Sequence, residues 1–147
     1  MKIIIVNEQS DLEIDENLIK NQVEKILEKE NIKTDELILY FVNEKTIKDL
    51  HNKFFNDPSL TDCISLPIDS ITSKESHHIL GEVFICPSVA VKYAKKNKLD
   101  PHFENTYYII HSLLHLMGYD DIDKNDRVIM KKKEKEIIEH LKETNLL

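Results

Sequence analysis

The chain is organised around one segment, His111-Ser-Leu-Leu-His115-Leu-Met-Gly118-Tyr-Asp120-Asp121. If this segment is helical, His111 and His115 lie at positions i and i+4, so their rings project from one face and can hold one metal ion. Gly118 suits the left-handed conformation that ends a helix, and the turn after it brings Asp120 and Asp121 back toward the histidines. Two imidazoles and one carboxylate leave the metal an open position, which is typical of a catalytic site.

Length and composition predict a single globular domain over residues 1–147. The chain is long enough to bury one hydrophobic core, and 41% of its residues are hydrophobic and 32% charged. No run approaches the roughly 20 apolar residues that span a bilayer. The apolar start at Met1 is short and lacks a cleavage site, so it predicts a strand and not an export signal. We therefore expect a cytoplasmic protein with no membrane partner.

Charge and cysteine content narrow the class of protein further. The formal charge of -7 argues against a broadly basic nucleic-acid-binding protein, although it allows a local basic patch that faces an RNA backbone. Cys63 and Cys86 are too few for a disulfide framework and lack the paired spacing of a zinc knuckle. Both lie in apolar, strand-like runs, so we expect buried free thiols.

Apolar periodicity predicts a mixture of strands and helices. Apolar runs predict four strands, of which the second is central and the last but one is an edge strand ended by Pro67: residues 2–6, 37–42, 61–67 and 80–86. Helical spacing predicts five helices, at about 15–30, 43–55, 87–98, 100–117 and 124–141. The expected fold is α+β, a small mixed four-stranded sheet packed with about five helices. The helix that carries the histidines is apolar almost all round and should be buried centrally.

Two of these helices have predicted buried stripes. In the second helix the stripe consists of Ile47, Leu50, Phe54 and Phe55. In the last helix it consists of Val128, Ile129, Ile137, Ile138 and Leu141. The histidines outside the central segment are expected to face solvent, since His77 and His78 lie in a polar loop and the others have no partner at ligand spacing: His51, His102 and His140.

The two histidines of the central segment could be ordinary residues of a core helix or metal ligands. The chain has seven histidines, so a pair four residues apart is weak evidence by itself. Two adjacent imidazoles on a buried helix nevertheless each need a hydrogen-bond partner, and a shared metal with outer acceptors meets that need. A zinc peptidase of the HExxH type is disfavoured, because Ser112 stands where its glutamate base belongs. The proton must then be handled by metal-bound water, Asp120 or Asp62.

Three ordered motifs resemble those of the YbeY family of bacterial metal-dependent endoribonucleases. Residues 61–67, TDCISLP, resemble the family's TDVLSFP; residues 80–87, LGEVFICP, resemble its LGDIxISP; and residues 111–121 resemble its HGxLHLxGYDH. The resemblance implies a small sheet with helices, zinc at His111 and His115, and hydrolysis of single-stranded RNA. It also implies a role in small-subunit ribosomal RNA maturation and ribosome quality control, with the small ribosomal subunit or its proteins as partners and no DNA substrate.

The sequence departs from the family pattern at three positions. Asp121 stands where the family has its third histidine ligand, and a carboxylate makes the metal a weaker Lewis acid and leaves manganese, nickel or iron as alternatives to zinc. Phe55 stands where the family has an arginine, a charge that this chain must find elsewhere, with Lys53 as one candidate. Ser112 replaces a glycine.

The sequence thus predicts a metal-dependent endoribonuclease in which His111, His115 and Asp121 hold the metal. Catalytic roles are predicted for three further residues that position substrate or water or carry a proton: Asp62, Ser65 and Asp120. Two alternatives stay open. One is a ribosome-associated assembly factor with a structural metal and little or no catalysis, and the other is a hydrolase of a small molecule or peptide.

Overall fold

Four strands and five helices make up the described part of the chain, residues 1–74 and 76–147, in this computed structural model. The strands are β1 (Lys2–Glu8), β2 (Glu36–Val42), β3 (Cys63–Pro67) and β4 (Ile79–Ile85). The helices are α1 (Glu16–Lys29), α2 (Glu44–Phe55), α3 (Pro87–Asn97), α4 (Pro101–Leu116) and α5 (Lys124–Glu143). The predicted α+β class and the number of helices and strands are confirmed.

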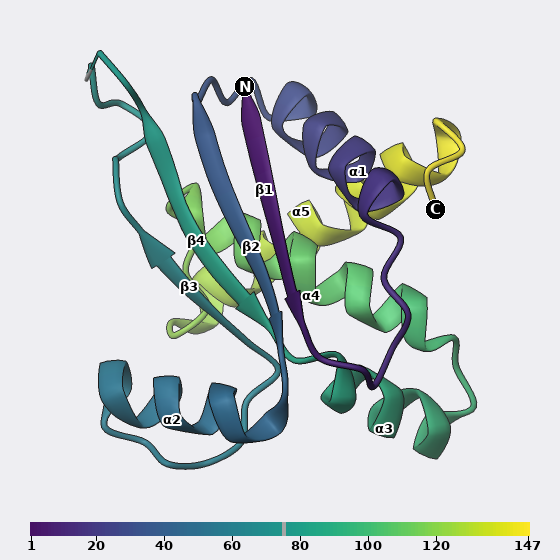
Figure 1. Ribbon diagram of the computed structural model, residues 1–147. Coiled ribbons are helices and arrows are strands. Elements are labelled where there is room, and N and C mark those ends of the chain that lie inside the picture. Colours follow the sequence, from purple (N-terminus) through teal and green to yellow (C-terminus); the bar gives the residue numbers. More distant parts are fainter. Residues whose placement is uncertain (75) are drawn as a thin grey trace.

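The sheet is mixed, with the strand order β1-β2-β4-β3 (Figure 1). β2 pairs in parallel with both β1 and β4, whereas β3 pairs with β4 in the antiparallel direction. β2 is therefore an interior strand and β3 an edge strand, as the sequence predicts. An edge position tolerates Pro67, because no neighbouring strand needs the N–H group that proline lacks.

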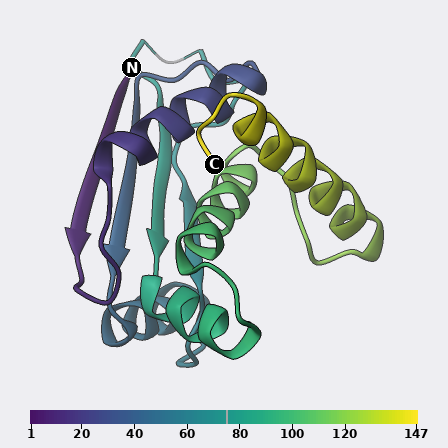
Figure 2. The same cartoon turned by 90° about the vertical axis from the view of Figure 1, so that its right-hand side faces the viewer.

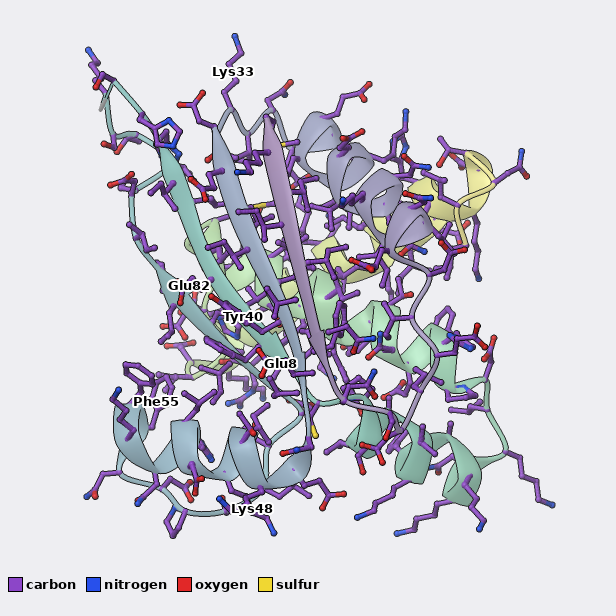
Figure 3. The ribbon with its side chains drawn as sticks, viewed as in Figure 1. Glu8, Lys33, Tyr40, Lys48, Phe55 and Glu82 are labelled. Atoms are coloured by element: carbon purple, nitrogen blue, oxygen red, sulfur yellow. The ribbon has the colours of Figure 1, made fainter. Side chains whose placement is uncertain are left out.

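The helices cover the two faces of the sheet unequally. Figure 2 shows α1, α4 and α5 on one face, with α2 and α3 near one end of the strands. On the opposite face, α2 buries Ile47 against Val42 and Ile64 at that end of the sheet only. The rest of this face carries Tyr40, which stacks on Phe84 with ring centres 4.5 Å apart, and the acidic residues Glu8 and Glu82 (Figure 3).

α4 is the central helix of the main core, as predicted. Asp100 caps its first turn by accepting a hydrogen bond from the N–H of His102, and Pro101 occupies a position where no helical N–H bond is lost. Its buried side chains include Tyr108, Ile109, Ile110, Leu113, Leu114 and Leu116. Within residues 1–74 and 76–147, neither this helix nor any other combines the length and apolar character needed to cross a membrane.

The predicted stripe of α2 is only half correct. Ile47 is fully buried and Leu50 is partly buried, but Phe54 and Phe55 are 45% and 55% exposed. The first turns of α2 pack on Val42 and Ile64, and its last turn does not reach this second cluster. The apolar residues keep helical spacing into the last turn of α2, but the sheet surface on which α2 packs ends before that turn.

The predicted stripe of α5 is rotated from the observed one. Val128 and Ile129 are 62% and 55% exposed, and the buried positions are Met130, Glu134, Ile137 and Leu141. Ile137 and Leu141 are therefore confirmed, and Ile138 packs against the core in part. The predicted stripe omitted Met130 and Glu134, which are 1% and 2% exposed.

One histidine predicted to face solvent is buried. His78 is 7% exposed, and its ring contacts the hydroxyl of Thr34 through Nδ1 and the carbonyl of Ser70 through Nε2, both at 2.8 Å. These contacts tie the connection between β3 and β4 to the start of β2. His77 and His102 are exposed as predicted, whereas His51 and His140 are half-buried.

Candidate metal centre

The predicted metal ligands converge at the C-terminal end of α4. The Nε2 atoms of His111 and His115 lie 3.1 Å apart. The Oδ2 atom of Asp121 lies 3.3 Å from Nε2 of His111 and 3.5 Å from Nε2 of His115. Within the part of the chain that the structure describes, these residues form a group of three side chains that could hold one metal ion.

The turn after α4 brings Asp121 to the histidines. Gly118 has φ +100°, a left-handed conformation that strains other residues, although open space surrounds the position where a side chain would stand. The N–H groups of Gly118 and Tyr119 donate to the carbonyls of His115 and Leu114, which ends the helix. The conformational requirement at Gly118 is therefore one of backbone geometry and not of packing space.

Asp120 and Arg127 shape the loop that follows. Oδ1 of Asp120 accepts hydrogen bonds from the N–H groups of Asp121, at 2.8 Å, and Ile122, at 3.4 Å. Nη1 of Arg127 donates to the carbonyl of Ile122 at 2.7 Å. Asp123 then caps α5 by accepting from the N–H of Asn125. These bonds hold the Asp121 carboxylate toward the histidines.

Both imidazoles are oriented by acceptors on their far side. Nδ1 of His111 donates to Oε2 of Glu134 at 3.2 Å, and Nδ1 of His115 donates to the carbonyl of Tyr119 at 3.0 Å. An ionised carboxylate or a carbonyl oxygen can only accept, so each Nδ1 carries a proton and each ring turns its Nε2 atom toward Asp121. Sequence reasoning missed Glu134, although a glutamate within the apolar positions of α5 is a signal that could have found it.

The geometry and charge of this group suit a cation. Tetrahedral bonds of about 2.0–2.1 Å separate ligand atoms by about 3.3 Å, close to the three distances between the ligand atoms. Two lone pairs and a carboxylate repel one another at such distances unless a positive charge lies between them. Burial lowers the pKa of His111, but its hydrogen bond to Glu134 and the nearby carboxylates raise the pKa above the ordinary value. The surroundings therefore stabilise positive charge at this point.

Two cavities open on either side of the three ligands. The first, the β3-side cavity, has a volume of about 450 Å³ and is lined by residues that include Phe55, Ser65, His115 and Asp120. The second, the α5-side cavity, has a volume of about 210 Å³ and is lined by residues that include Asp62, His111, Asp121, Arg127 and Lys131. The metal centre can thus be reached from two directions.

The residues predicted to be catalytic are divided between these cavities. Asp62 lines the α5-side cavity, where its Oδ1 accepts from the thiol of Cys63 at 3.3 Å. Ser65 lines the β3-side cavity, and its hydroxyl donates to the carbonyl of Ser112 at 2.9 Å, which joins β3 to α4. Burial and the charge of Asp62 raise the pKa of the Cys63 thiol, which keeps it protonated.

Two cations could replace the charge of the arginine that the family pattern has where this chain has Phe55, and they lie on different helices. The Lys53 ammonium sits 5.3 Å from the centre of the Phe54 ring, and Lys53 lines neither of the two cavities. Arg127 lines the α5-side cavity beside His111. Sequence reasoning missed Arg127, because the packing of α5 on α4 that brings it to this cavity cannot be predicted from the residues around it.

Fold and site together define a small α+β domain with a group of three side chains that could hold a metal ion at the end of its central helix. The sequence pattern of the family described as Endoribonuclease YbeY matches residues 4–142, and the chain belongs to this family. The Endoribonuclease YbeY of Protochlamydia amoebophila is 45% identical over 140 residues, which cover 95% of this chain and 93% of that protein. The Endoribonuclease YbeY of Chlamydia caviae is 38% identical over 150 residues, which cover 100% and 95%.

A solved structure has the same fold. The solution structure of TM1509 from Thermotoga maritima matches with a TM-score of 0.66 and 25% sequence identity. The match covers 95% of this chain and 89% of that chain. The arrangement of the sheet and helices is therefore one that a related sequence adopts.

Proposed function

We propose that this protein is a metal-dependent endoribonuclease that hydrolyses single-stranded RNA. The observation that carries the proposal is the convergence of His111, His115 and Asp121 beside two open cavities, in a chain whose relatives are named endoribonucleases. The proposal extends to the maturation of small-subunit ribosomal RNA and to ribosome quality control in the cytoplasm, with the small ribosomal subunit or its proteins as partners.

Each residue of the site has a distinct task in this proposal. His111, His115 and Asp121 hold the ion, which supplies Lewis acidity and lowers the pKa of water when it is bound. Glu134 and the Tyr119 carbonyl keep the two imidazoles in the orientation that ligation needs.

Three further residues act around the ligands. Asp62, on the α5-side wall, is placed to accept a proton from an attacking water. Ser65 holds β3 against α4 and keeps the substrate wall in place, and Asp120 fixes the loop that carries Asp121.

Zinc is the metal that we propose. Two imidazoles and one carboxylate form a known set of zinc ligands with an open fourth position, and the three ligand separations suit tetrahedral bonds. The same donors also suit manganese, nickel or iron. Elemental analysis of the purified wild-type protein identifies the metal, and about one zinc per chain is the expected result.

Cleavage of single-stranded RNA tests the proposed function. Purified protein should cut the RNA, and both a chelator and the substitution His115→Ala should abolish the cutting. A His140→Ala variant, changed at a half-buried histidine of α5 that does not belong to the metal group, is the matched control and should cut like the wild type. Cleavage that survives both chelation and His115→Ala would contradict the proposal.

A second function is favoured by the residues at positions 55 and 121. Asp121 replaces a histidine ligand of the family pattern and Phe55 replaces its arginine. Both changes suit a ribosome-associated factor in which the metal has a structural task and not a catalytic one. In that case Asp121→Asn should lower thermal stability and leave binding to ribosomal particles unchanged. The RNA-cleavage assay separates the two functions, since the structural factor does not cut RNA. The cations of the α5-side cavity favour RNA over a small-molecule substrate.

A further inference from the structure

A groove between α4 and α5 leads away from the metal centre. Its cavity has a volume of about 580 Å³ and shares Asp62, Tyr107 and Lys131 with the α5-side cavity, so the two are continuous. We call the two together the α4–α5 groove. Figure 2 shows α4 and α5 on the same side of the sheet, with the loop after α4 leading into α5. The groove is therefore a path along which a polymer can extend beside α5 from the ligands.

One wall of the α4–α5 groove is a row of cations on α5. Arg127, Lys131 and Lys135 line it at positions i, i+4 and i+8, so they lie on one face of the helix with a rise of about 6 Å from each to the next. Among the described residues, none of these three has a carboxylate within ion-pair distance. Lys133, on another face, contacts Glu30 at 3.3 Å and Glu136 at 3.2 Å. These three cations are therefore not held in ion pairs, although the lining of the groove also contains the carboxylates of Asp62, Glu104, Asp121 and Glu134.

The opposite wall carries aromatic rings. Phe103 and Tyr107 lie at positions i and i+4 on α4, and Tyr93 of α3 lines the same groove and is 47% exposed. The Lys142 ammonium stands 5.9 Å from the centre of the Phe103 ring, so a fourth cation lies toward the far end. Rows of rings beside cations are how proteins hold single-stranded nucleic acid, with bases stacked on the rings and phosphates on the charges.

The carboxylates of the groove are engaged with the protein. Glu134 accepts from Nδ1 of His111, and the carboxylates of Glu134 and Glu104 interact with the hydroxyls of Tyr107 and Tyr108, whose pKa values they help burial to raise. Asp62 accepts from the thiol of Cys63. These groups therefore belong to the wall and the metal centre, whereas the lysines are free to meet a ligand.

We propose that the α4–α5 groove binds the nucleotides on one side of the phosphate that is cleaved. Lys131 and Lys135 contact the backbone phosphates, and the aromatic wall stacks the bases. The inference rests on the proposed nuclease function and deepens it, because it assigns the direction in which the RNA leaves the metal centre. Arg127, the single arginine of the chain, is the cation next to the ligands.

The test compares two double variants of α5 that remove the same charge. Lys131→Gln with Lys135→Gln changes the groove, and Lys124→Gln with Lys132→Gln changes exposed lysines of the same helix that line neither part of it. Arg127 stays unchanged, because its bond to the Ile122 carbonyl also supports the loop. The dissociation constant for a fluorescent 12-nucleotide single-stranded RNA is measured by anisotropy in chelator, which prevents cutting, over a range of salt concentrations.

The groove variant should bind RNA about tenfold more weakly at 0.15 M salt. The salt slope, which is the slope of log association constant against log salt concentration, should become shallower by about 1.4, because each lost phosphate contact removes about 0.7 from its magnitude. The control variant should change the dissociation constant by less than about twofold, since its charges are screened over that distance. Equal losses in the two variants, or unchanged binding by the groove variant, would overturn the proposal. Displacement of RNA by polyglutamate of equal charge would overturn the assignment to RNA.

Cleavage measured with metal separates this proposal from the proposed function. If the wild type cuts RNA and the groove variant binds and cuts equally well, the groove proposal fails and the nuclease function stands. If the wild type binds RNA through the groove lysines but does not cut it, the nuclease function fails and the groove assignment stands.

Discussion

The two cavities beside the metal centre differ in the charge that they offer a substrate. The β3-side cavity is lined by Phe55, Ser65 and the loop carboxylate Asp120, and no lysine or arginine of the described residues lines it. The α5-side cavity has Arg127 and Lys131 and continues into the α4–α5 groove. Both cavities reach Asp121, and each is lined by one of the two histidines, so the same site has one approach with lysine and arginine and one without them. Among the described residues, only the approach from α5 thus offers lysine or arginine side chains to a phosphate backbone.

The largest expected effect comes from the ligand that both cavities share. Asp121→Ala removes one of three ligands, and we expect metal content well below one ion per chain and cleavage more than about 100-fold slower. Asp121→His supplies a neutral ligand and should retain the metal. Elemental analysis and a single-turnover cleavage assay measure both variants. Full metal content in Asp121→Ala would show that Asp121 is not a ligand.

A smaller effect is expected in the wall of the α5-side cavity, at Glu134. Glu134→Gln preserves the shape of the side chain but removes the charge that orients His111, and we expect metal affinity to fall by about 10–100-fold. A competition titration against a chelator measures the affinity. Glu139→Gln, on the exposed side of α5, removes the same charge and should leave metal affinity unchanged. Equal losses in the two variants would rule out a specific task for Glu134.

The contrast between the cavities can be reduced by adding a cation to the β3-side cavity. Phe55→Arg replaces an exposed ring that lines it, and we expect RNA binding to be about fourfold tighter at 0.15 M salt, with a salt slope larger by about 0.7. Phe54→Arg is the matched control, because Phe54 is exposed on the same turn but does not line the cavity. An equal gain in both variants would indicate general attraction and no contact in the β3-side cavity.

The smallest effect is expected at the base of α2, the helix that carries Phe55. Glu44 accepts hydrogen bonds from Lys92 and Ser88 of α3, and the bond from Lys92 is the main reason that the pKa of Glu44 is lowered. A lowered pKa in the folded state stabilises the protein above the ordinary pKa near 4.5, and this gain is lost as the pH falls through the folded-state value. Glu44→Gln should therefore lower the urea midpoint slightly at pH 7 and less at pH 4.

Asp49→Asn on the same helix is the control for this prediction, because its ion pair with Lys45 is more exposed. It should change the midpoint less than Glu44→Gln does at pH 7. A Glu44→Gln effect that is the same at both pH values would show that the charge of Glu44 is not the cause.

Prediction from the sequence was reliable where the information is local. The four strands and five helices follow from apolar periodicity and capping residues, and the interior place of β2 and the edge place of β3 follow from their composition. Prediction failed where burial depends on the extent of another element. Phe54 lies beyond the cluster that α2 covers, and Val128 lies on a face of α5 that turns away from the core.

The sequence by itself determined the parts of the metal centre that are close along the chain. The spacing of His111 and His115 sets both rings on one helical face, and Gly118 permits the turn that returns Asp121 to them. Only the tertiary structure decided that Glu134 orients His111 and that Arg127, Lys131 and Lys135 face the aromatic rings of α4. The physical reason is that these contacts depend on the rotation of α5 against α4, which is set by packing across the whole core and not by local periodicity.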